Sequence, residues 1–321
     1  MWSCTPCVQA TTVGVVRTTV CCEIRQARDR LADEFPEIDV VDPETALAAD
    51  TPVDIVFGGW GPHAAAIVER GVQWVQLSGT GIDGVDDRIL RAPVVTCARG
   101  ASSVPISEYV LAAMLAFAKD FPANWLRDAP EHWNFQRMGT LADRTIGIVG
   151  FGGIGTRVAQ LARAFDMEVV VMRRRPELGS SLPGVRVVTS LPELLGVADH
   201  IVLAAPGTAR TRHLLDAAAF SQMRSGVHLV NIARGSLVDQ DALRTALDDG
   251  TVARASLDTC DPEPLPAGHW LYEHPKVFLT PHSSWASPEF FAASIDIFCS
   301  NLRRFLDGAP LEHVIDRAEG Y

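Results

Sequence analysis

The stretch GIVGFGGIG, residues 147–155, decides the fold of this chain. It ends an apolar run and opens the amphipathic segment GIGTRVAQLARAF, and its glycines follow the pattern G-x-G-x-x-G. Such glycines permit a tight turn and a close backbone approach to a pyrophosphate, whose charge the free N–H groups at a helix N-terminus hold. With a strand before it and a second strand ending at Met172, the pattern predicts a dinucleotide site. The residues of this loop that we expect to contact the cofactor are Gly150, Gly152, Gly153, Ile154 and Gly155.

A basic run, VVVMRRRPE at residues 169–177, ends that second strand. Its first arginine, Arg173, stands where a dinucleotide fold places the residue that reads the ribose, about 20 residues past the glycine loop. A carboxylate there accepts hydrogen bonds from a 2′-hydroxyl, whereas a guanidinium pairs with a 2′-phosphate through a planar fork of donors. We therefore expect NADP, with NAD as the alternative, and a second contact from Arg174 or Arg175. The competing interpretation is a solvated basic turn that touches no ligand.

Apolar runs alternate with helical stretches on both sides of the glycine loop. Runs typical of buried strands lie at 12–16, 53–59, 72–79, 93–98, 145–149, 168–172, 185–188, 200–205, 228–233, 254–258 and 277–280. Helical spacing occurs at 22–35, 63–70, 104–119, 239–250 and 289–308, whereas 120–144 shows no clear period. This alternation predicts an α/β chain with mostly parallel sheets covered on both faces, and 321 residues suit two domains.

The totals exclude several classes of protein. A net charge of −11 leaves no basic surplus for a general nucleic-acid binder. No run of 18 apolar residues occurs, so we expect no membrane span. The start, MWSCTPCVQA, lacks the charged residues and apolar core of a secretory signal, and we expect a cytoplasmic location. Seven cysteines are scattered, so we expect reduced thiols and no metal site, although Cys4 and Cys7 form a C-x-x-C.

Three further stretches follow predicted strands of the second series and carry polar side chains. They are LVNIARGSLVDQDAL at 229–243, SLDTCDPEPLP at 256–266 and LTPHSSWAS at 279–287. Because ligands bind outside the carboxyl ends of the strands in doubly wound sheets, we expect these stretches to meet at one edge of the sheet. Their candidate site residues are Arg234, Asp258, Glu263 and His282.

Together with the glycine loop, these motifs resemble the D-isomer-specific 2-hydroxyacid dehydrogenases, in the family's order and from about residue 53 to 310. The resemblance implies two doubly wound parallel-sheet domains. A Rossmann dinucleotide domain at 104–285 would be inserted into a flavodoxin-like substrate domain formed by 1–103 and 286–321. It also implies a homodimer, for which the helix and arm at 104–143 are the candidate contact, with Trp125, Trp133 and Phe135.

The resemblance also implies roles for individual residues. Arg234 would bind the substrate carboxylate and polarise the carbonyl, and His282 would give a proton to the developing alkoxide as hydride arrives from the nicotinamide. Glu263 would pair with His282, while Asp258 would lie by the nicotinamide or its ribose. Ala233 is placed with the cofactor contacts. In QLSGTGIDGVD, 76–86, the backbone N–H groups of Thr80 and Gly81 would meet the substrate carboxylate opposite Arg234, and the alternative for them is a plain turn at a strand end.

The proposed chemistry has its own physical logic. Reduction of a 2-keto acid needs a proton donor, and a carboxylate beside a histidine favours the protonated imidazolium. The arginine fork matches two carboxylate oxygens. Two departures from the family pattern are Gly153, where a larger residue, often arginine, is common, and Cys260, where a hydrophobic or aromatic residue is frequent. Trp60 and Trp285 are candidates either to wall the pocket or to pack in the core.

We therefore expect a reductase of small 2-keto acids, such as glyoxylate or hydroxypyruvate, that uses NADPH. One alternative is oxidation of a phosphoglycerate-type 2-hydroxyacid with NAD, which the arginines disfavour and for which we would expect a regulatory domain after residue 321. The other is a dinucleotide-sensing, corepressor-like binding protein that keeps the same residues. Turnover of a small keto acid would count strongly against the binding protein.

Overall fold

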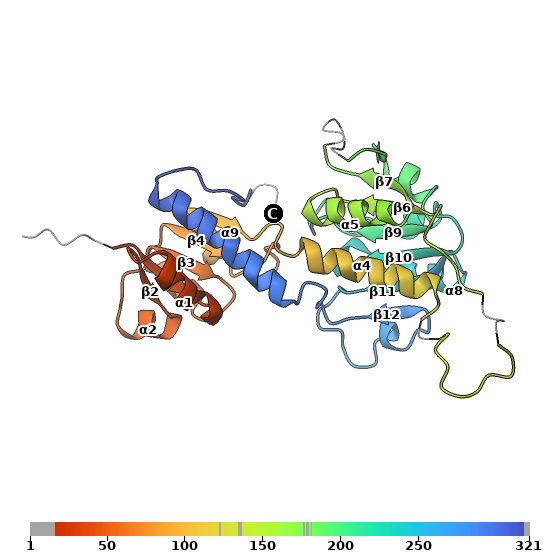
Figure 1. Ribbon diagram of the computed structural model, residues 1–321, viewed down its shortest axis with the longest axis horizontal. Coiled ribbons are helices and arrows are strands. Elements are labelled where there is room, and N and C mark those ends of the chain that lie inside the picture. Colours follow the sequence, from red (N-terminus) through yellow and green to blue (C-terminus); the bar gives the residue numbers. More distant parts are fainter. Residues whose placement is uncertain are drawn as a thin grey trace, which may run out of the picture. The chain divides into compact units, whose positions relative to one another are not determined.

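The computed structural model describes residues 17–121, 123–133, 137–175, 177, 180 and 182–317 of the chain (Figure 1). They form two compact units, of which the first comprises residues up to Leu77 and Val85–Thr96 and the second Ser78–Gly84 and the chain from Cys97 onward. Each unit contains a sheet with helices, which confirms the predicted α/β class. The domain boundaries expected at 103–104 and 285–286 stay a prediction, and the strand expected at 12–16 lies outside the described residues.

The first sheet has the strand order β2-β1-β3-β4-β5, which is the flavodoxin-type order. Strand β1 pairs in parallel with β2 and β3, and β3 pairs in parallel with β4. Its strands are β1 (Thr19–Cys22), β2 (Asp39–Val41), β3 (Ile55–Gly58), β4 (Trp74–Leu77) and β5 (Val94–Cys97), and its helices are α1 (Arg25–Glu34), α2 (Pro43–Ala48) and α3 (Ala64–Glu69).

The start of this sheet differs from the sequence prediction. The helix expected from residue 22 begins at Arg25, because Cys22 is the last, fully buried residue of β1. Strand β2 has three residues, too few for a periodic pattern to stand out from the flanking turn residues. Strands β1 and β2 are therefore determined more by pairing within the sheet than by their own sequence pattern.

The second sheet has the order β12-β11-β10-β9-β6-β7-β8, and every neighbouring pair is parallel. Its strands are β6 (Thr145–Val149), β7 (Glu168–Met172), β8 (Val185–Val188), β9 (His200–Leu203), β10 (Val227–Asn231), β11 (Val252–Leu257) and β12 (Val277–Leu279). From β6 the chain adds β7 and β8 on one side and then crosses to β9 on the other. This reversal between β6 and β9 is the switch point at which dinucleotide folds bind their ligand.

Helices cover both faces of the second sheet. Helices α4 (Ser103–Ala118) and α5 (Gly153–Ala164) lie side by side on one face (Figure 1). The other face carries α6 (Leu191–Leu195), α7 (Ala217–Phe220) and α8 (Gln240–Asp248). In β7, Val169 and Val171 pack toward α4 and α5 while Val170 packs toward the opposite core, as the period of two in a strand requires. Apolar side chains on both faces explain why these strands read as unbroken hydrophobic runs.

The chain closes with α9 (Pro288–Leu306), whose start is fixed by Ser287: the Ser287 side chain accepts a hydrogen bond from the Phe290 N–H at 3.2 Å. The helix stops two residues before Gly308, which has a φ of +67°. Within the described part of 120–144, no helix or strand forms beyond α4 until Thr145, in line with the missing period. None of the described helices is long and apolar enough to cross a membrane.

Two buried histidines lie at the amino ends of central strands. His200 begins β9, His228 is the second residue of β10, and their Nδ1 atoms are 3.2 Å apart. His228 Nε2 lies 3.0 Å from Ser256 Oγ, and the ring of Phe117 stacks on His228 with a centroid distance of 4.6 Å. Burial lowers the pKa of His200 to about 4 and the pKa of His228 well below its usual value. Both rings are therefore neutral at physiological pH.

Candidate active site

The glycine loop follows β6 and is locked against its neighbours. Gly150 has a φ of +101°, and a Cβ atom there would lie 2.6 Å from the backbone of Ala204. A Cβ on Gly155 would lie 2.1 Å from the carbonyl oxygen of Gly150. The Gly150 N–H donates to the carbonyl of Met172 at 2.8 Å, which ties the loop to the end of β7. Only glycine fits at 150 and 155, so the backbone itself forms the floor of the loop.

A buried hydroxyl faces the start of α5. Ser103 Oγ is buried and, among the described residues, has no hydrogen-bond partner. A Cβ on Gly153 would lie 2.9 Å from this oxygen, so Ser103 borders the first turn of α5. An unsatisfied buried hydroxyl is unfavourable, and the N–H groups of a helix N-terminus attract anions. These features fit a dinucleotide phosphate, and the short distance to Ser103 leaves little room for a side chain at Gly153.

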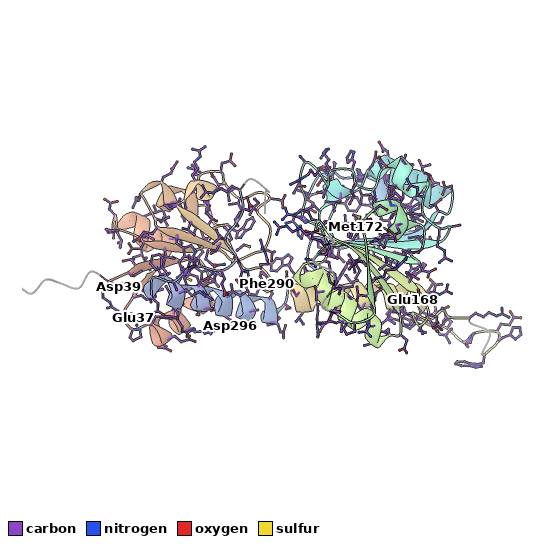
Figure 2. The ribbon with its side chains drawn as sticks, turned by 90° about the horizontal axis from the view of Figure 1, so that it is seen from above. Glu37, Asp39, Glu168, Met172, Phe290 and Asp296 are labelled. Atoms are coloured by element: carbon purple, nitrogen blue, oxygen red, sulfur yellow. The ribbon has the colours of Figure 1, made fainter. Side chains whose placement is uncertain are left out.

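Arg173 lies beside the same loop. It follows Met172 at the carboxyl end of β7, the strand that runs from Glu168 to Met172 in Figure 2. The guanidinium carbon of Arg173 is 5.9 Å from the ring centre of Phe151, the residue between the first two glycines. Arg174 and Arg175 are exposed. The structure thus brings Arg173 to the glycine loop and leaves the next two arginines facing solvent.

His282 and Glu263 form a hydrogen-bonded pair. His282 Nδ1 lies 2.8 Å from Glu263 Oε2, and the side chains are 38% and 35% exposed. The second carboxylate oxygen of Glu263 accepts a hydrogen bond from the Cys260 N–H at 3.0 Å, which fixes the orientation of the carboxylate. Glu263 follows β11 and His282 follows β12, so both lie at the carboxyl edge of the sheet. With Nδ1 engaged, Nε2 is the ring nitrogen that can reach a substrate.

The backbone of His282 is held in a left-handed conformation. Its φ is +51°, a value that is uncommon for a non-glycine residue. The His282 N–H donates to the Asp258 carbonyl at 2.9 Å, and Trp285 Nε1 donates to the His282 carbonyl at 2.8 Å. Trp285 also packs on Phe290 with a centroid distance of 4.8 Å. Trp285 therefore braces the histidine loop, while Trp60 lies in the other compact unit and is 46% exposed.

Asp258 is a buried carboxylate with three donors. It is 2% exposed and accepts hydrogen bonds from Thr280 Oγ1 at 2.6 Å, from the Ser283 N–H at 2.9 Å and from the Ser284 N–H at 3.0 Å. A buried charge is costly unless such donors compensate for the lost water. Asp258 therefore organises the turn that carries His282.

Arg234 is oriented by three neighbours. Its Nε donates to Asp83 Oδ2 at 2.7 Å and its Nη1 donates to the Ala233 carbonyl at 2.6 Å. A Cβ on Gly81 would lie 1.9 Å from Arg234 Nη2, so the arginine tip rests directly on the Gly81 backbone. Of the predicted pair, Gly81 thus lies at Arg234, whereas the Thr80 hydroxyl donates to the Ala98 carbonyl at 3.2 Å.

The loops after β10 and β11 are in close backbone contact. A Cβ on Gly235 would lie 1.9 Å from the carbonyl carbon of Cys260, so only glycine allows this approach. Asn231 fixes the first loop, because its Nδ2 donates to the Arg234 carbonyl at 2.9 Å and its Oδ1 accepts from the Ala233 N–H at 3.0 Å. Burial and the neighbouring Glu263 raise the pKa of Cys260 to about 11, so this residue is a neutral, unreactive thiol at pH 7.

Sequence reasoning missed several residues of this arrangement. Asp83, Asn231 and Thr280 stand inside motifs already singled out, and their polar side chains were the available signal. Two more residues, Ser103 and Tyr109, lie on α4 and carry no local signal, because only the packing of α4 brings them to the loops. Among the residues that the structure describes, no group of three or more His, Cys, Asp or Glu side chains could hold a metal ion. Cys4 and Cys7 lie outside that part of the chain.

Known proteins share these features. Residues 111–284, more than half of the chain, match the family model of the D-isomer specific 2-hydroxyacid dehydrogenase NAD-binding domain. Glycerate dehydrogenase of Methylorubrum extorquens is 30% identical over 250 residues, which are 74% of this chain and 76% of the relative. D-3-phosphoglycerate dehydrogenase of Methanocaldococcus jannaschii is 31% identical over 244 residues, which are 74% of this chain. The match covers 46% of that relative, so this chain spans about half of its length.

The solved structures agree with the sequence matches. An NADPH-dependent glyoxylate/hydroxypyruvate reductase from Sinorhizobium meliloti, solved in complex with NADP and sulfate, is similar with a TM-score of 0.80 and 25% identity. The similarity covers 95% of this chain and 99% of that one. The glycine loop, the sheet order and the loops that carry Arg234, Glu263 and His282 lie within the matched regions. The chain belongs to the D-isomer specific 2-hydroxyacid dehydrogenases, as its motifs predicted.

Proposed function

We propose that this protein reduces small 2-keto acids of the glyoxylate or hydroxypyruvate type with NADPH. The observation that carries the proposal is the 2.8 Å contact between His282 Nδ1 and Glu263 Oε2, at the sheet edge that also carries Arg234. Such a pair supplies a proton, and the arginine supplies a place for a carboxylate. The similarity to the Sinorhizobium meliloti reductase favours the same substrate class and cofactor.

The residues of the chain divide the reaction between them. The Arg234 guanidinium binds the substrate carboxylate, and the neighbouring Asp83 keeps its fork in one orientation. His282 donates a proton from Nε2 to the carbonyl oxygen as that oxygen becomes an alkoxide. Glu263 stabilises the imidazolium before transfer and holds the ring in place. When bound, the reduced cofactor supplies a hydride to the carbonyl carbon. The glycine loop at 150–155 and Ser103 would hold the phosphates of the cofactor, and Asp258 would lie by its nicotinamide end.

The deciding experiment follows reduced-nicotinamide absorbance with purified protein. NADPH and NADH are compared across glyoxylate, hydroxypyruvate, pyruvate and bulkier keto acids. We expect the highest kcat/KM with NADPH as the cofactor and with glyoxylate or hydroxypyruvate as the substrate. No turnover with any of these keto acids would refute the proposal.

Arg173 and Arg174 are expected to select the phosphorylated cofactor. Replacing both with alanine should lower kcat/KM for NADPH about 10- to 100-fold, because each arginine loses a charge-assisted hydrogen bond to the 2′-phosphate. The kcat/KM for NADH should change by less than about threefold, because NADH has no 2′-phosphate. Steady-state kinetics with both cofactors measures the ratio. Arg186→Ala is the matched control, because Arg186 is 52% exposed and pairs with Glu193. A wild-type protein that uses NADH as well as NADPH would show that the arginines do not read the cofactor.

Gly81 is expected to be required for the position of Arg234. In Gly81→Ala the new Cβ would lie 1.9 Å from Arg234 Nη2, so the guanidinium must move away from its present place. We expect kcat/KM for the keto acid to fall about 100-fold, the size of effect that a displacement of about 1 Å produces, with unchanged cofactor affinity and melting temperature. Gly196→Ala is the control, because its Cβ would meet only the Pro192 carbonyl oxygen at 3.3 Å. Equal kinetics for the two variants would contradict this role of Gly81.

A second function has one observation in its favour. The similarity to D-3-phosphoglycerate dehydrogenase of Methanocaldococcus jannaschii favours oxidation of a phosphorylated 2-hydroxyacid with NAD. The same absorbance assay with 3-phosphoglycerate and NAD decides between the two functions. The arginines at 173–175 favour the phosphorylated cofactor and therefore the first function. Turnover in either assay argues against a protein that only senses the dinucleotide.

We also propose that the chain forms a homodimer through α4 and the following arm. Trp125 is 61% exposed and Trp133 is 71% exposed, an unusual placement for large aromatic side chains in a monomer. Phe135, the third aromatic residue expected in this contact, lies outside the described residues. The cytoplasmic location stays a prediction.

A further inference from the structure

A directed chain of hydrogen bonds runs from α4 to the carboxylate beneath the catalytic loop. Tyr109 Oη lies 2.8 Å from Thr280 Oγ1, and Thr280 Oγ1 donates to Asp258 Oδ1 at 2.6 Å. Tyr109 belongs to α4, Asp258 follows β11 and Thr280 follows β12, so the chain joins three elements. Neither Tyr109 nor Thr280 is a residue to which the proposed mechanism gives a role.

The direction of the proton donors in this chain is fixed. A threonine hydroxyl has one proton, and that of Thr280 is given to Asp258, since an ionised carboxylate can only accept. The Tyr109 hydroxyl must therefore be the donor to Thr280 Oγ1. Burial, with a smaller contribution from the nearby Asp258 charge, raises the pKa of Tyr109 above its usual value, so the phenol keeps its proton at working pH. The chain thus delivers two aligned donors toward one buried negative charge.

Asp258 connects this chain of hydrogen bonds to the turn that carries His282. Its carboxylate accepts the N–H groups of Ser283 and Ser284, and its carbonyl accepts the N–H of His282. These contacts define the turn in which His282 has a φ of +51°. A left-handed non-glycine residue costs energy and persists only where its surroundings hold it. The turn is therefore sensitive to any loss of charge or orientation at Asp258.

We propose that Tyr109 and Thr280 are positioning residues that keep the Asp258 carboxylate oriented, and that through Asp258 they hold His282 in its proton-donating position. The inference rests on the proposed function only for the role of His282 as the proton donor. Four groups that titrate meet here: Tyr109 on α4, Asp258 after β11, Glu263 in the same loop and His282 after β12. Because this chain of hydrogen bonds ends on the Asp258 carboxylate, breaking it should change the pH dependence of the reaction as well as its rate.

Three substitutions test the chain with little change of shape. Thr280→Val keeps the β-branched shape and removes the hydroxyl, Thr280→Ser keeps the hydroxyl, and Tyr109→Phe removes only the phenol oxygen. We expect kcat to fall about 10- to 100-fold in Thr280→Val, less than about 10-fold in Tyr109→Phe and less than about threefold in Thr280→Ser. KM for the keto acid should be unchanged, since Arg234 keeps its contacts with Asp83 and Ala233.

The pH profile separates positioning from mere structural support. In Thr280→Val the pH profile of kcat should differ from that of the wild-type protein, because the carboxylate that holds the histidine turn loses its shortest hydrogen bond. Tyr109→Phe should give a smaller change, and Thr280→Ser should restore the wild-type profile. Matched controls are Tyr272→Phe, whose hydroxyl donates to the Leu265 carbonyl, and Thr245→Val, whose hydroxyl donates to the Asp241 carbonyl. Both controls should leave the profile unchanged.

A measurement without cofactor or substrate makes the test independent of the proposed function. Protein labelled with ¹³C at histidine is titrated by NMR, and the His282 signal is identified by its loss in His282→Asn. In Thr280→Val we expect the response of this signal to pH to differ from that of the wild-type protein, and in Thr280→Ser to match it, because Thr280 acts through Asp258 on the turn that holds His282. A shifted response in a protein that turns over no keto acid would support the inference and refute the proposed function. Normal turnover with unchanged NMR response and pH profile in Thr280→Val would overturn the inference.

Discussion

Replacing His282 with asparagine is expected to lower kcat for keto acid reduction about 10²- to 10⁴-fold, the usual contribution of a positioned general acid. Asparagine has no ionisable proton to give, yet it tolerates the left-handed backbone that His282 adopts at a φ of +51°. The loop should therefore keep its course, and the affinity for NADPH should change little. Steady-state kinetics, with cofactor binding followed by tryptophan fluorescence, measures both quantities.

The backbone conformation of His282 allows a matched control. His313 also lies in the left-handed region, with a φ of +58°, but has no place in the proposed reaction. His313→Asn should leave kcat within about threefold of the wild-type value. If His282→Asn retained wild-type kcat, the proton would come from another group, and the pairing of His282 with Glu263 would be structural.

The second large effect concerns stability in acid. The unfolded chain binds a proton at His200 near pH 6.5, whereas the buried side chain in the folded protein has a pKa of about 4. Between these values the unfolded state holds more protons, so the free energy of unfolding falls as pH is lowered from 6.5 to 4. The difference in pKa corresponds to about 3 kcal/mol, and the buried His228 acts in the same direction. Such a loss is a large part of the stability of an ordinary domain.

Urea unfolding at a series of pH values measures this loss. In His200→Phe, whose ring cannot bind a proton, the midpoint should fall less steeply between pH 6.5 and 4, even if the variant is less stable at pH 7. His132→Gln is the control, because the His132 side chain is 64% exposed, and it should keep the wild-type slope. Paired surface carboxylates act at lower pH: the Arg88 side chain lowers the pKa of Asp86 to about 2, so that contribution disappears only below the histidine range. Equal slopes in wild type and His200→Phe would show that the histidine pair does not govern acid stability.

Much of the second sheet could be predicted from sequence, because its strands are buried on both faces. Strands β7 and β8 were predicted at the residues where they occur, since EVVVM and VRVV have no polar interruptions long enough to obscure them. In the first sheet β1 and β2 have four and three residues, and pairing alone distinguishes them from the adjoining helix and turn. Short segments carry too little pattern to decide between helix and strand.

The residues of the candidate site also differ in how well the sequence predicts them. Arg234, Glu263 and His282 each follow a predicted strand, and the shared edge of a parallel sheet was enough to bring them together. Tyr109 and Thr280 are 171 positions apart, and only the packing of α4 against the sheet makes them neighbours. Asp83 and Gly81 reach Arg234 for a similar reason, since no sequence pattern states which side chain a turn will meet. Local motifs therefore predict the reacting groups, whereas the residues that orient these groups depend on tertiary packing.

The histidine pair and the catalytic loops lie at opposite ends of the same strands. His200 and His228 stand at the amino ends of β9 and β10, and the reacting groups follow the carboxyl ends of β10, β11 and β12. A strand of four or five residues separates them by roughly 13 to 17 Å, beyond the range in which substitutions usually influence one another. Acid tolerance and the working pH of the reaction are thus separable traits. Selection or protein engineering can adapt this fold to a more acidic environment at one edge of the sheet while the chemistry at the other edge stays as it is.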